Sequence, residues 1–309
     1  MTTSHPGGTG TLGEHTVARI GYGAMGLEHD VPHDDALAVL RRAVALGVNH
    51  IDTASFYADG LVNRRIRDAL SPHADDLVIV SKVGARSAAS GPLPLVLAQQ
   101  PAELRAAVEL DLAELGMERI PVVNLRRADL GPGLIAEGDQ IVDLDDQLAE
   151  LITLRDEGKI GGIGISNVDL ATLHRALPAG IVCVQNAYNM LNRTHEDELA
   201  LCTERGIAWV PFFPLGSAFP RFPKVADNAV VQGVARELGV TGAQVGLAWL
   251  LAHAPNILLI AGTAKVAHLE QNLAAGEIVF SSEQLAALDG VAAESPDGDG
   301  VEAFLDERR

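Results

Sequence analysis

The stretch Leu77-Val78-Ile79-Val80, followed at once by Ser81-Lys82, shows a pattern that recurs along the whole chain. Its short apolar run is typical of a buried strand. An amphipathic stretch with helical periodicity follows at about 101–115. The pattern predicts a strand with polar side chains at its carboxyl end, and then a helix.

The same alternation of strand and helix extends in both directions from this stretch. The predicted strands cover 17–20, 49–51, 77–80, 120–123, 160–165, 181–184, 207–210 and 257–260. The predicted helices cover about 36–47, 61–70, 101–115, 144–157, 169–177, 195–205, 225–238 and 242–252. Eight such units in one chain favour an α/β fold of the closed (β/α)8 type, the TIM barrel.

The barrel is expected to be a single domain spanning 1–309, because no linker, repeat or low-complexity tract divides the chain. A barrel of this class uses ~250 residues as one unit. The ends, 1–15 and 294–309, are expected to be more mobile than the rest. Two long loops, 126–143 and 213–224, follow the fourth and seventh strands, where such barrels bind ligands.

Composition restricts the partners of the chain. Lys and Arg number 23 against 41 Asp and Glu, a net charge of −18, which repels polyanions and predicts no nucleic-acid partner. No apolar run reaches the ~18 residues of a membrane span, and no signal-peptide pattern begins the chain. We therefore expect a cytoplasmic protein with no membrane partner.

The cysteines and histidines predict neither a disulfide framework nor a metal site. The two cysteines are Cys183, inside the apolar run 180–184, and Cys202. The histidines have no metal-ligand spacing.

A glycine motif, Gly21-Tyr22-Gly23-Ala24-Met25-Gly26, matches the dinucleotide fingerprint G-x-G-x-x-G. That fingerprint needs its third glycine inside a helix, but residues 27–32 intervene before any helical pattern begins. We interpret the motif as the glycine-rich end of the first barrel strand, which a ligand approaches closely.

Chemistry-bearing side chains stand where the predicted strands end. These residues are Asp52, Lys82, Asn124, Ser166, Asn167 and Gln185 on the second to sixth strands, Phe212 on the seventh, and Tyr57 in the loop after Asp52. In a (β/α)8 barrel these ends converge on one mouth, where enzymes of this fold place their active sites.

The motifs that carry these residues resemble the aldo-keto reductase family over about residues 16–275. They are His50-Ile51-Asp52-Thr53-Ala54 with Tyr57, Ser81-Lys82-Val83-Gly84, Gly164-Ile165-Ser166-Asn167, Gln185 with Tyr188-Asn189, Pro214-Leu215-Gly216, and Ala261-Gly262-Thr263 with Asn272. The resemblance implies a reductase that uses NAD(P)H to convert the carbonyl of a small aldehyde or ketone into an alcohol.

The resemblance also implies roles for the catalytic residues. Tyr57 would be the general acid, and a phenol with a pKa of ~10 would need that pKa lowered to act near neutrality. Lys82 would favour the phenolate, and Asp52 would keep Lys82 protonated. Asn124 stands where most members of the family have His. Because an amide cannot become cationic, Asn124 predicts a preference for electron-poor carbonyls.

The cofactor residues follow from the same resemblance. Ser166, Asn167 and Gln185 would bind the nicotinamide carboxamide, and Phe212 would stack on its ring. The backbone at Ala24, Met25, Leu215, Gly216 and Ser217 would line the ribose and pyrophosphate, with Arg221 and Lys224 as further candidates. The adenosine end would meet Gly262, Thr263, Lys265, His268, Gln271 and Asn272. Lys265 and Thr263 favour NADP(H) over NAD(H).

The sequence leaves alternatives open for the substrate and for the function. Asn124 together with Asn63 is similar to a bacterial subgroup near the pyridoxal reductases, which suggests an activated aldehyde such as pyridoxal. Arg126 and Arg127 are expected to be solvated, the alternative being that one of them faces an anionic substrate. Two other functions are a Schiff-base lyase that uses Lys82 and a nicotinamide-binding regulatory barrel with little turnover.

Overall fold

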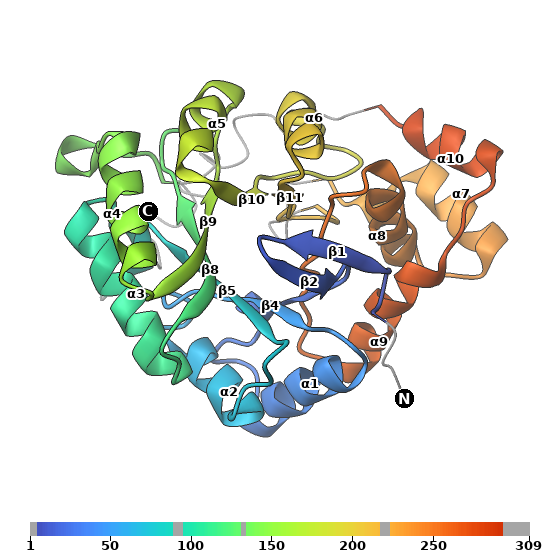
Figure 1. Cartoon of the computed structure of the whole chain (residues 1–309). Coiled ribbons are helices and arrows are strands. Elements are labelled where there is room, and N and C mark those ends of the chain that lie inside the picture. The colour runs from blue at the N-terminus through green and yellow to red at the C-terminus, as the bar shows by residue number, and fades with distance from the viewer. Residues whose placement is uncertain (1–4, 89–94, 131–133, 217–222, 293–309) are drawn as a thin grey trace.

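The computed structural model describes residues 5–88, 95–130, 134–216 and 223–292. Parallel strands curl into a central barrel, and helices surround it (Figure 1). The ladder runs in the order β11-β10-β9-β8-β5-β4-β3. These strands are β3 (Tyr22–Gly23), β4 (His50–Asp52), β5 (Val78–Val83), β8 (Ile120–Arg126), β9 (Ile160–Ser166), β10 (Ile181–Gln185) and β11 (Ala208–Trp209).

The segment 257–260 is the eighth strand and closes the barrel. Ile257 forms a parallel bridge to Trp209, and Leu259 forms one to Ile20. The backbone N–H of Gly21 donates to the Leu259 carbonyl at 2.8 Å. The predicted (β/α)8 fold is confirmed.

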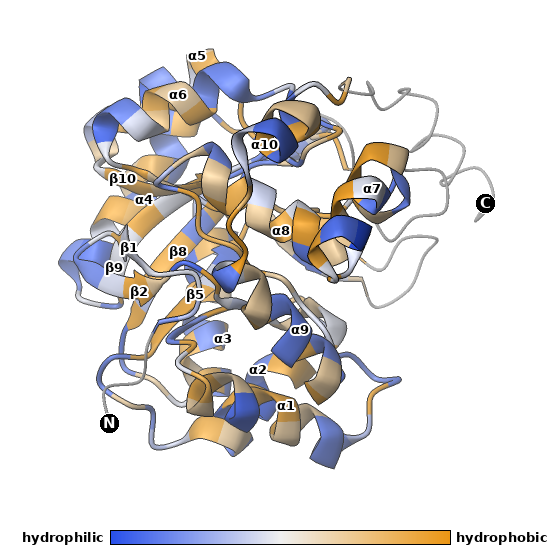
Figure 2. Ribbon diagram, turned by 90° about the vertical axis from the view of Figure 1, so that its right-hand side faces the viewer, coloured by the Kyte–Doolittle hydropathy of each residue, from blue (hydrophilic) through white to orange (hydrophobic). Residues whose placement is uncertain are grey.

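The helices that surround the barrel follow its strands in sequence. They are α1 (His33–Ala45), α2 (Leu61–Leu70), α3 (Pro101–Leu115), α4 (Leu144–Asp156), α5 (Leu170–Ala176), α6 (Glu196–Arg205), α7 (Ala229–Leu238), α8 (Gly242–His253), α9 (Val266–Ala274) and α10 (Ser282–Asp289). The helices mix hydrophilic and hydrophobic residues, whereas the central strands are mainly hydrophobic (Figure 2). The sequence prediction missed α9 and α10, and it merged α7 with the short 3-10 helix at Val225–Asp227.

An antiparallel hairpin, β1 (Thr9–Leu12) and β2 (His15–Ala18), covers the amino-terminal end of the barrel (Figure 1). Its apolar residues Leu12 and Val17 pack against inward-facing residues of the strands, among them Val78, Val122 and Cys183. The predicted first strand at 17–20 is therefore wrong in part, since Val17 and Ala18 belong to the hairpin, whereas Ile20 bridges Leu259 and leads into β3. A short β-branched run has the same sequence pattern in a hairpin strand and in a barrel strand. The first strand of the hairpin lies within the stretch 1–15 that was expected to be mobile, and its Leu12 is buried by this apolar packing. The tail from 294 lies outside the described residues.

The glycine motif at 21–26 serves close packing within the protein. A Cβ on Gly21 would lie 2.1 Å from His50 Nε2, and one on Gly23 would lie 2.3 Å from the Ile260 carbonyl oxygen. Protein atoms fill the space beside Gly21 and Gly23, whereas nothing lies within 4 Å of a Cβ on Gly26, and the approach of a ligand to this strand end stays a prediction. The rejection of a dinucleotide fingerprint is confirmed, since α1 begins only at His33.

A second hairpin, β6 (Ala85–Ser87) and β7 (Leu95–Leu97), follows β5. It was not predicted, because each of its strands has only three residues. It leaves the carboxyl end of β5, close in sequence to Lys82.

Candidate active site

The carboxyl ends of five neighbouring strands bring the predicted polar residues together. Lys82 on β5 pairs in register with Asn124 on β8, and Ser166 on β9 pairs with Gln185 on β10. Asp52 is the last residue of β4, which pairs with β5. All five side chains are buried. The barrel therefore gathers the predicted site at one mouth.

A buried ion pair lies at the centre of this site. Lys82 Nζ donates a hydrogen bond to Asp52 Oδ1 and a second one, 3.1 Å long, to the Thr53 carbonyl oxygen. Gln185 Nε2 donates to the other Asp52 oxygen at 2.8 Å. Both oxygens of the carboxylate are thus occupied, which fixes the direction in which the ammonium points.

Tyr57 lies directly against this pair. Lys82 Nζ is 5.0 Å from the centroid of the Tyr57 ring, and the Phe56 ring meets Tyr57 edge-on at 5.3 Å between centroids. Ala58, Asp59 and Gly60 follow with positive φ angles of 50°, 53° and 72°. This tight left-handed turn carries the chain from Tyr57 into α2.

The electrostatics of the site differ from the sequence prediction for Tyr57. Desolvation raises the pKa of Tyr57, and this effect outweighs the lowering by the Lys82 charge and hydrogen bond and by the Arg126 charge. The predicted lowering of the Tyr57 pKa is therefore wrong in this structure. Burial by itself would lower the pKa of Lys82, but the Asp52 charge raises it above its ordinary value. At neutral pH the phenol keeps its proton and the lysine stays cationic.

Asn124 lies below the accessible surface of the mouth. Its side chain is 0% exposed, and neither amide atom has a hydrogen-bond partner among the described residues. A Cβ on Gly164 would lie 1.9 Å from Asn124 Oδ1, so that glycine makes room for the amide. A substrate carbonyl can contact Asn124 only if the side chain or its surroundings shift.

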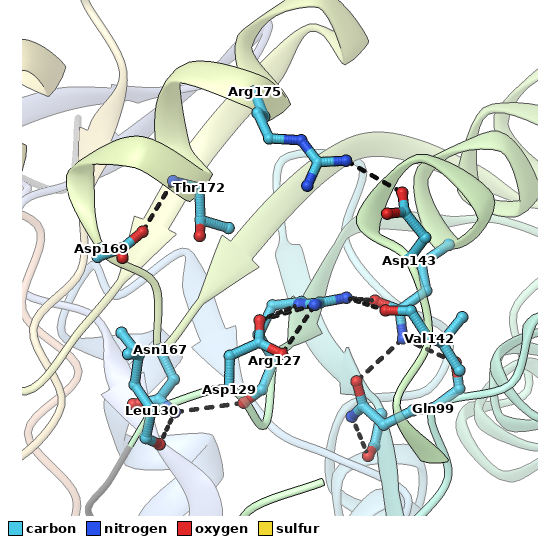
Figure 3. Close-up of polar contacts among 12 residues, drawn as sticks. Gln99, Arg127, Asp129, Leu130, Val142, Asp143, Asn167, Asp169, Thr172 and Arg175 are labelled. Carbon is cyan, nitrogen blue, oxygen red and sulfur yellow. Dashed lines mark hydrogen bonds and ion pairs between the residues drawn. The ribbon is translucent and has the colours of Figure 1, made fainter. Parts of the chain in front are cut away.

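The predicted nicotinamide residues differ in what they offer to a ligand. Gln185 Oε1 is buried and has no partner in the described part of the chain. The Asn167 amide nitrogen donates to the Leu130 carbonyl at 2.7 Å, so it holds the loop after β8 (Figure 3). Ser166 is buried at the mouth, and Phe212 is half-buried with its ring 5.1 Å from that of Phe213.

The residues assigned to the phosphate and adenosine parts of the cofactor follow the seventh and eighth strands. Lys265 is exposed at the start of α9, and its backbone N–H donates to Thr263 Oγ1 at 3.1 Å. Gly216 has a φ of 90°, and a Cβ there would lie 2.2 Å from the Pro223 carbonyl oxygen and 3.2 Å from Lys224 Cα.

The other assigned residues vary in exposure. Ala24 is buried, Met25 is 51% exposed, Leu215 and Asn272 are half-buried, and Gly262, His268 and Gln271 are exposed. Ser217 and Arg221 lie outside the described residues.

Arg127 is a structural residue and not the solvated side chain that was expected. Its guanidinium pairs with Asp129 at 2.7 Å and donates to the Val142 carbonyl at 3.1 Å and to the Gln147 side chain. Gln147 in turn donates to Gln99. These contacts fasten both ends of the long loop after β8. Two of the partners lie 15 and 20 residues away, and local sequence pattern does not reveal partners at that separation.

A buried polar network behind the ion pair was not predicted. Asn63 on α2 accepts a hydrogen bond from the Thr53 hydroxyl and donates one to Asp111 on α3, each 2.7 Å long. The Ser81 hydroxyl donates to the second Asp111 oxygen, also at 2.7 Å. Thr53 and Ser81 are the chain neighbours of Asp52 and Lys82. The network thus supports the Lys82–Asp52 ion pair from the outer face of the strands.

Asp111 gives this network a pH dependence. Burial raises the pKa of Asp111 to about 7, although the hydrogen bonds from Ser81 and Asn63 act in the opposite direction. Folding therefore favours the protonated acid. Its stabilisation is complete below the unfolded pKa, near 4, and is lost as the pH rises towards 7.

The substitution Asp111→Asn tests this linkage, because the amide resembles the protonated acid. We expect the unfolding free energy of the variant to gain about 1–3 kcal/mol on that of the parent protein between pH 5 and pH 8. Denaturant unfolding at both pH values measures the difference, and Asp156→Asn on α4 is the control. If the difference in unfolding free energy between the variant and the parent protein did not change with pH, the raised pKa of Asp111 would be contradicted.

The described residues were compared with the requirements of a metal site and of a membrane-spanning helix. Among them, no cluster of three or more His, Cys, Asp or Glu side chains is arranged to hold a metal ion. None of the helices within these ranges is long and apolar enough to cross a membrane.

Comparison with known proteins agrees with the fold. A sequence model of the Aldo/keto reductase family matches residues 19–293. The chain is 44% identical over 294 residues to pyridoxine 4-dehydrogenase of Escherichia coli (strain K12), covering 93% of this chain and 99% of that protein. It is 33% identical over 291 residues to an uncharacterized oxidoreductase of Schizosaccharomyces pombe, covering 91% and 89%. A crystal structure of an aldo-keto reductase from Klebsiella pneumoniae in complex with NADPH superposes with a TM-score of 0.78 at 28% identity, covering 96% and 97%. The chain therefore belongs to the aldo/keto reductase family.

Proposed function

We propose that this protein reduces an electron-poor aromatic aldehyde of the pyridoxal type, using NADPH in preference to NADH. Membership of the family makes it an NAD(P)H-dependent oxidoreductase that acts on carbonyl compounds. The substrate class is supported by the relative named pyridoxine 4-dehydrogenase, which shares 44% of the aligned residues. The observation that carries the chemistry is a protonated Tyr57 set against the buried Lys82–Asp52 pair.

The residues at the mouth fit a nicotinamide cofactor. The unpaired, buried Gln185 Oε1 can accept a hydrogen bond from a carboxamide N–H, and Ser166 lies beside it on the next strand. Phe212 offers a half-buried aromatic ring nearby along the mouth. The preference for NADPH is supported by the exposed Lys265 at the predicted adenosine end and by the similar Klebsiella structures in complex with NADPH and with NADP.

Tyr57 performs the proton transfer in this proposal. When bound, the reduced nicotinamide supplies the hydride. Tyr57 holds its proton at neutral pH and donates it to the carbonyl oxygen as negative charge develops there. Lys82 stabilises the phenolate that remains, and Asp52 keeps Lys82 cationic and oriented. With its pKa raised, the phenol is protonated at neutral pH, which is the form that carbonyl reduction uses.

The two alternatives have less support. A Schiff-base lyase needs a neutral, nucleophilic Lys82, but its pKa is raised and its ammonium is paired with Asp52. A regulatory barrel with little turnover is tested by a panel of carbonyl substrates with NADPH. The cytoplasmic location and the lack of a nucleic-acid partner stay predictions from composition.

The substitution Tyr57→Phe tests the acid. We expect turnover to fall by ~100-fold or more, since a positioned general acid contributes on this scale. NADPH affinity, measured by fluorescence titration, should be retained. Tyr188→Phe, which removes a hydroxyl bonded to Glu196 and His253, is the control and should keep its turnover. Near-normal turnover in Tyr57→Phe would reject the assignment.

Cofactor choice is tested at Lys265. If Lys265 contacts the 2′-phosphate, Lys265→Ala should weaken NADPH binding by roughly 1.5–3 kcal/mol and leave NADH binding almost unchanged. Lys159→Ala, at an ion pair with Glu109, should change neither affinity. Equal losses for the two cofactors would place Lys265 away from the phosphate.

The last of these tests concerns Asn124. Without a cationic donor at this position, stabilisation of the developing charge comes mainly from Tyr57 and from the substrate itself. The protein should therefore reduce activated aldehydes far better than aliphatic ketones, and Asn124→His should narrow that gap if the ring fits beside Gly164. Matched kcat/KM values for one aldehyde and one ketone give the answer. A parent protein that reduces both equally well would contradict the proposed restriction.

A further inference from the structure

Arg126 is a cation at the mouth that has no partner within the described chain. It is the last residue of β8, two positions beyond Asn124, and its Cα is in register with Ser166. Its guanidinium takes part in no hydrogen bond or ion pair among the described residues. Nη1 is fully buried without a partner. The neighbouring Arg127, by contrast, is satisfied by Asp129, Val142 and Gln147.

The position of Arg126 relates it to the reacting groups. Residues two apart on a strand face the same side, so Arg126 stands above Asn124 on the face that lines the mouth. Its charge reaches Tyr57, where it lowers the phenol pKa. The Lys82 charge is already balanced by Asp52, and therefore Arg126 carries the positive charge near Tyr57 that is not compensated by a described residue.

Arg126 is half-buried, and a buried guanidinium nitrogen without an acceptor is unfavourable, which indicates that a ligand supplies the acceptor. The cofactor phosphates are assigned to residues after the first, seventh and eighth strands, whereas Arg126 ends the fourth. The acceptor is therefore expected to belong to the substrate. A guanidinium prefers an anionic oxygen, which it can bind through two N–H groups.

We propose that Arg126 binds an oxyanion that the substrate carries next to its aldehyde, a phenolate or a carboxylate on the adjacent ring position. The proposal rests on the function proposed above and narrows its substrate class. Pyridoxal fits this class, since its ring hydroxyl adjoins the aldehyde. Arg126 would thus orient the carbonyl towards Tyr57 and select aldehydes with an ionised neighbouring group.

The test compares two aldehydes that differ only in the oxyanion, pyridine-4-carbaldehyde and its 3-hydroxy derivative. We expect Arg126→Gln to lower kcat/KM for the hydroxy aldehyde by about 10–100-fold, and that for the parent aldehyde by less than about 3-fold. Benzaldehyde and 2-carboxybenzaldehyde form a second pair, which tests whether Arg126 binds a carboxylate beside the aldehyde. Arg119→Gln is the control, because Arg119 is exposed and directly precedes the opposite end of the same strand.

The comparison separates binding of an oxyanion from an effect through Tyr57. Loss of the Arg126 charge would also raise the Tyr57 pKa, but that change acts on all aldehydes alike. A loss confined to the oxyanion member of either pair supports the proposal. Equal losses for both members of each pair, or no loss, would overturn it.

A binding experiment gives a second readout that needs no turnover. The probe is 2-nitrophenol, an unreactive compound that carries its ionisable oxygen beside a planar polar group. With NADP bound, the parent protein should raise the absorbance of the nitrophenolate at pH 6.5, and Arg126→Gln should not. Equal spectra would overturn the proposal. If the parent protein bound the anion through Arg126 but reduced no aldehyde, the result would reject the proposed reaction and support the anion site.

Discussion

The buried ion pair between Lys82 and Asp52 sets the conditions for the rest of the mouth. Two charges are removed from water at a cost that is repaid only when every remaining donor and acceptor is satisfied. The Thr53 carbonyl and the Gln185 amide meet that requirement. Gln185 comes from the sixth barrel strand and Asp52 from the second, so the pair is completed only because the sheet curls. The state of Tyr57 then follows from its position against this pair.

Because side chains alternate along a strand, the end of each strand places one residue towards the mouth and its neighbour towards the outer helices. Asp52 and Lys82 face the mouth, whereas their neighbours Thr53 and Ser81 reach outwards to Asn63 and Asp111. The ion pair is therefore tied through two strands to the helices α2 and α3. A change in the packing of these helices has a direct route to the catalytic residues, and the acid Asp111 makes that route sensitive to pH.

The two arginines after Asn124 show how neighbours in sequence acquire different roles. Arg127 is directed into the loop after β8, where side-chain and backbone acceptors neutralise or satisfy it. Arg126 is directed to the opposite side, towards the mouth, and meets no described acceptor. The alternation of the strand separates them, since one residue points inwards and the next points away. Under the proposal made above, an anionic oxygen of the substrate supplies the acceptor for Arg126 near Tyr57.

The sequence by itself determined the positions of seven barrel strands, most of the surrounding helices and the mouth residues Asp52, Lys82, Asn124, Ser166 and Gln185. These features depend on local hydrophobic periodicity and on the rule that parallel strands present their carboxyl ends together. Only the tertiary structure decided that Val17 belongs to a hairpin, that Arg127 is buried, that Asn63 and Asp111 back the catalytic pair, and that the Tyr57 pKa is raised. Each of these depends on burial and on partners distant in the chain, and neither quantity can be read from local pattern.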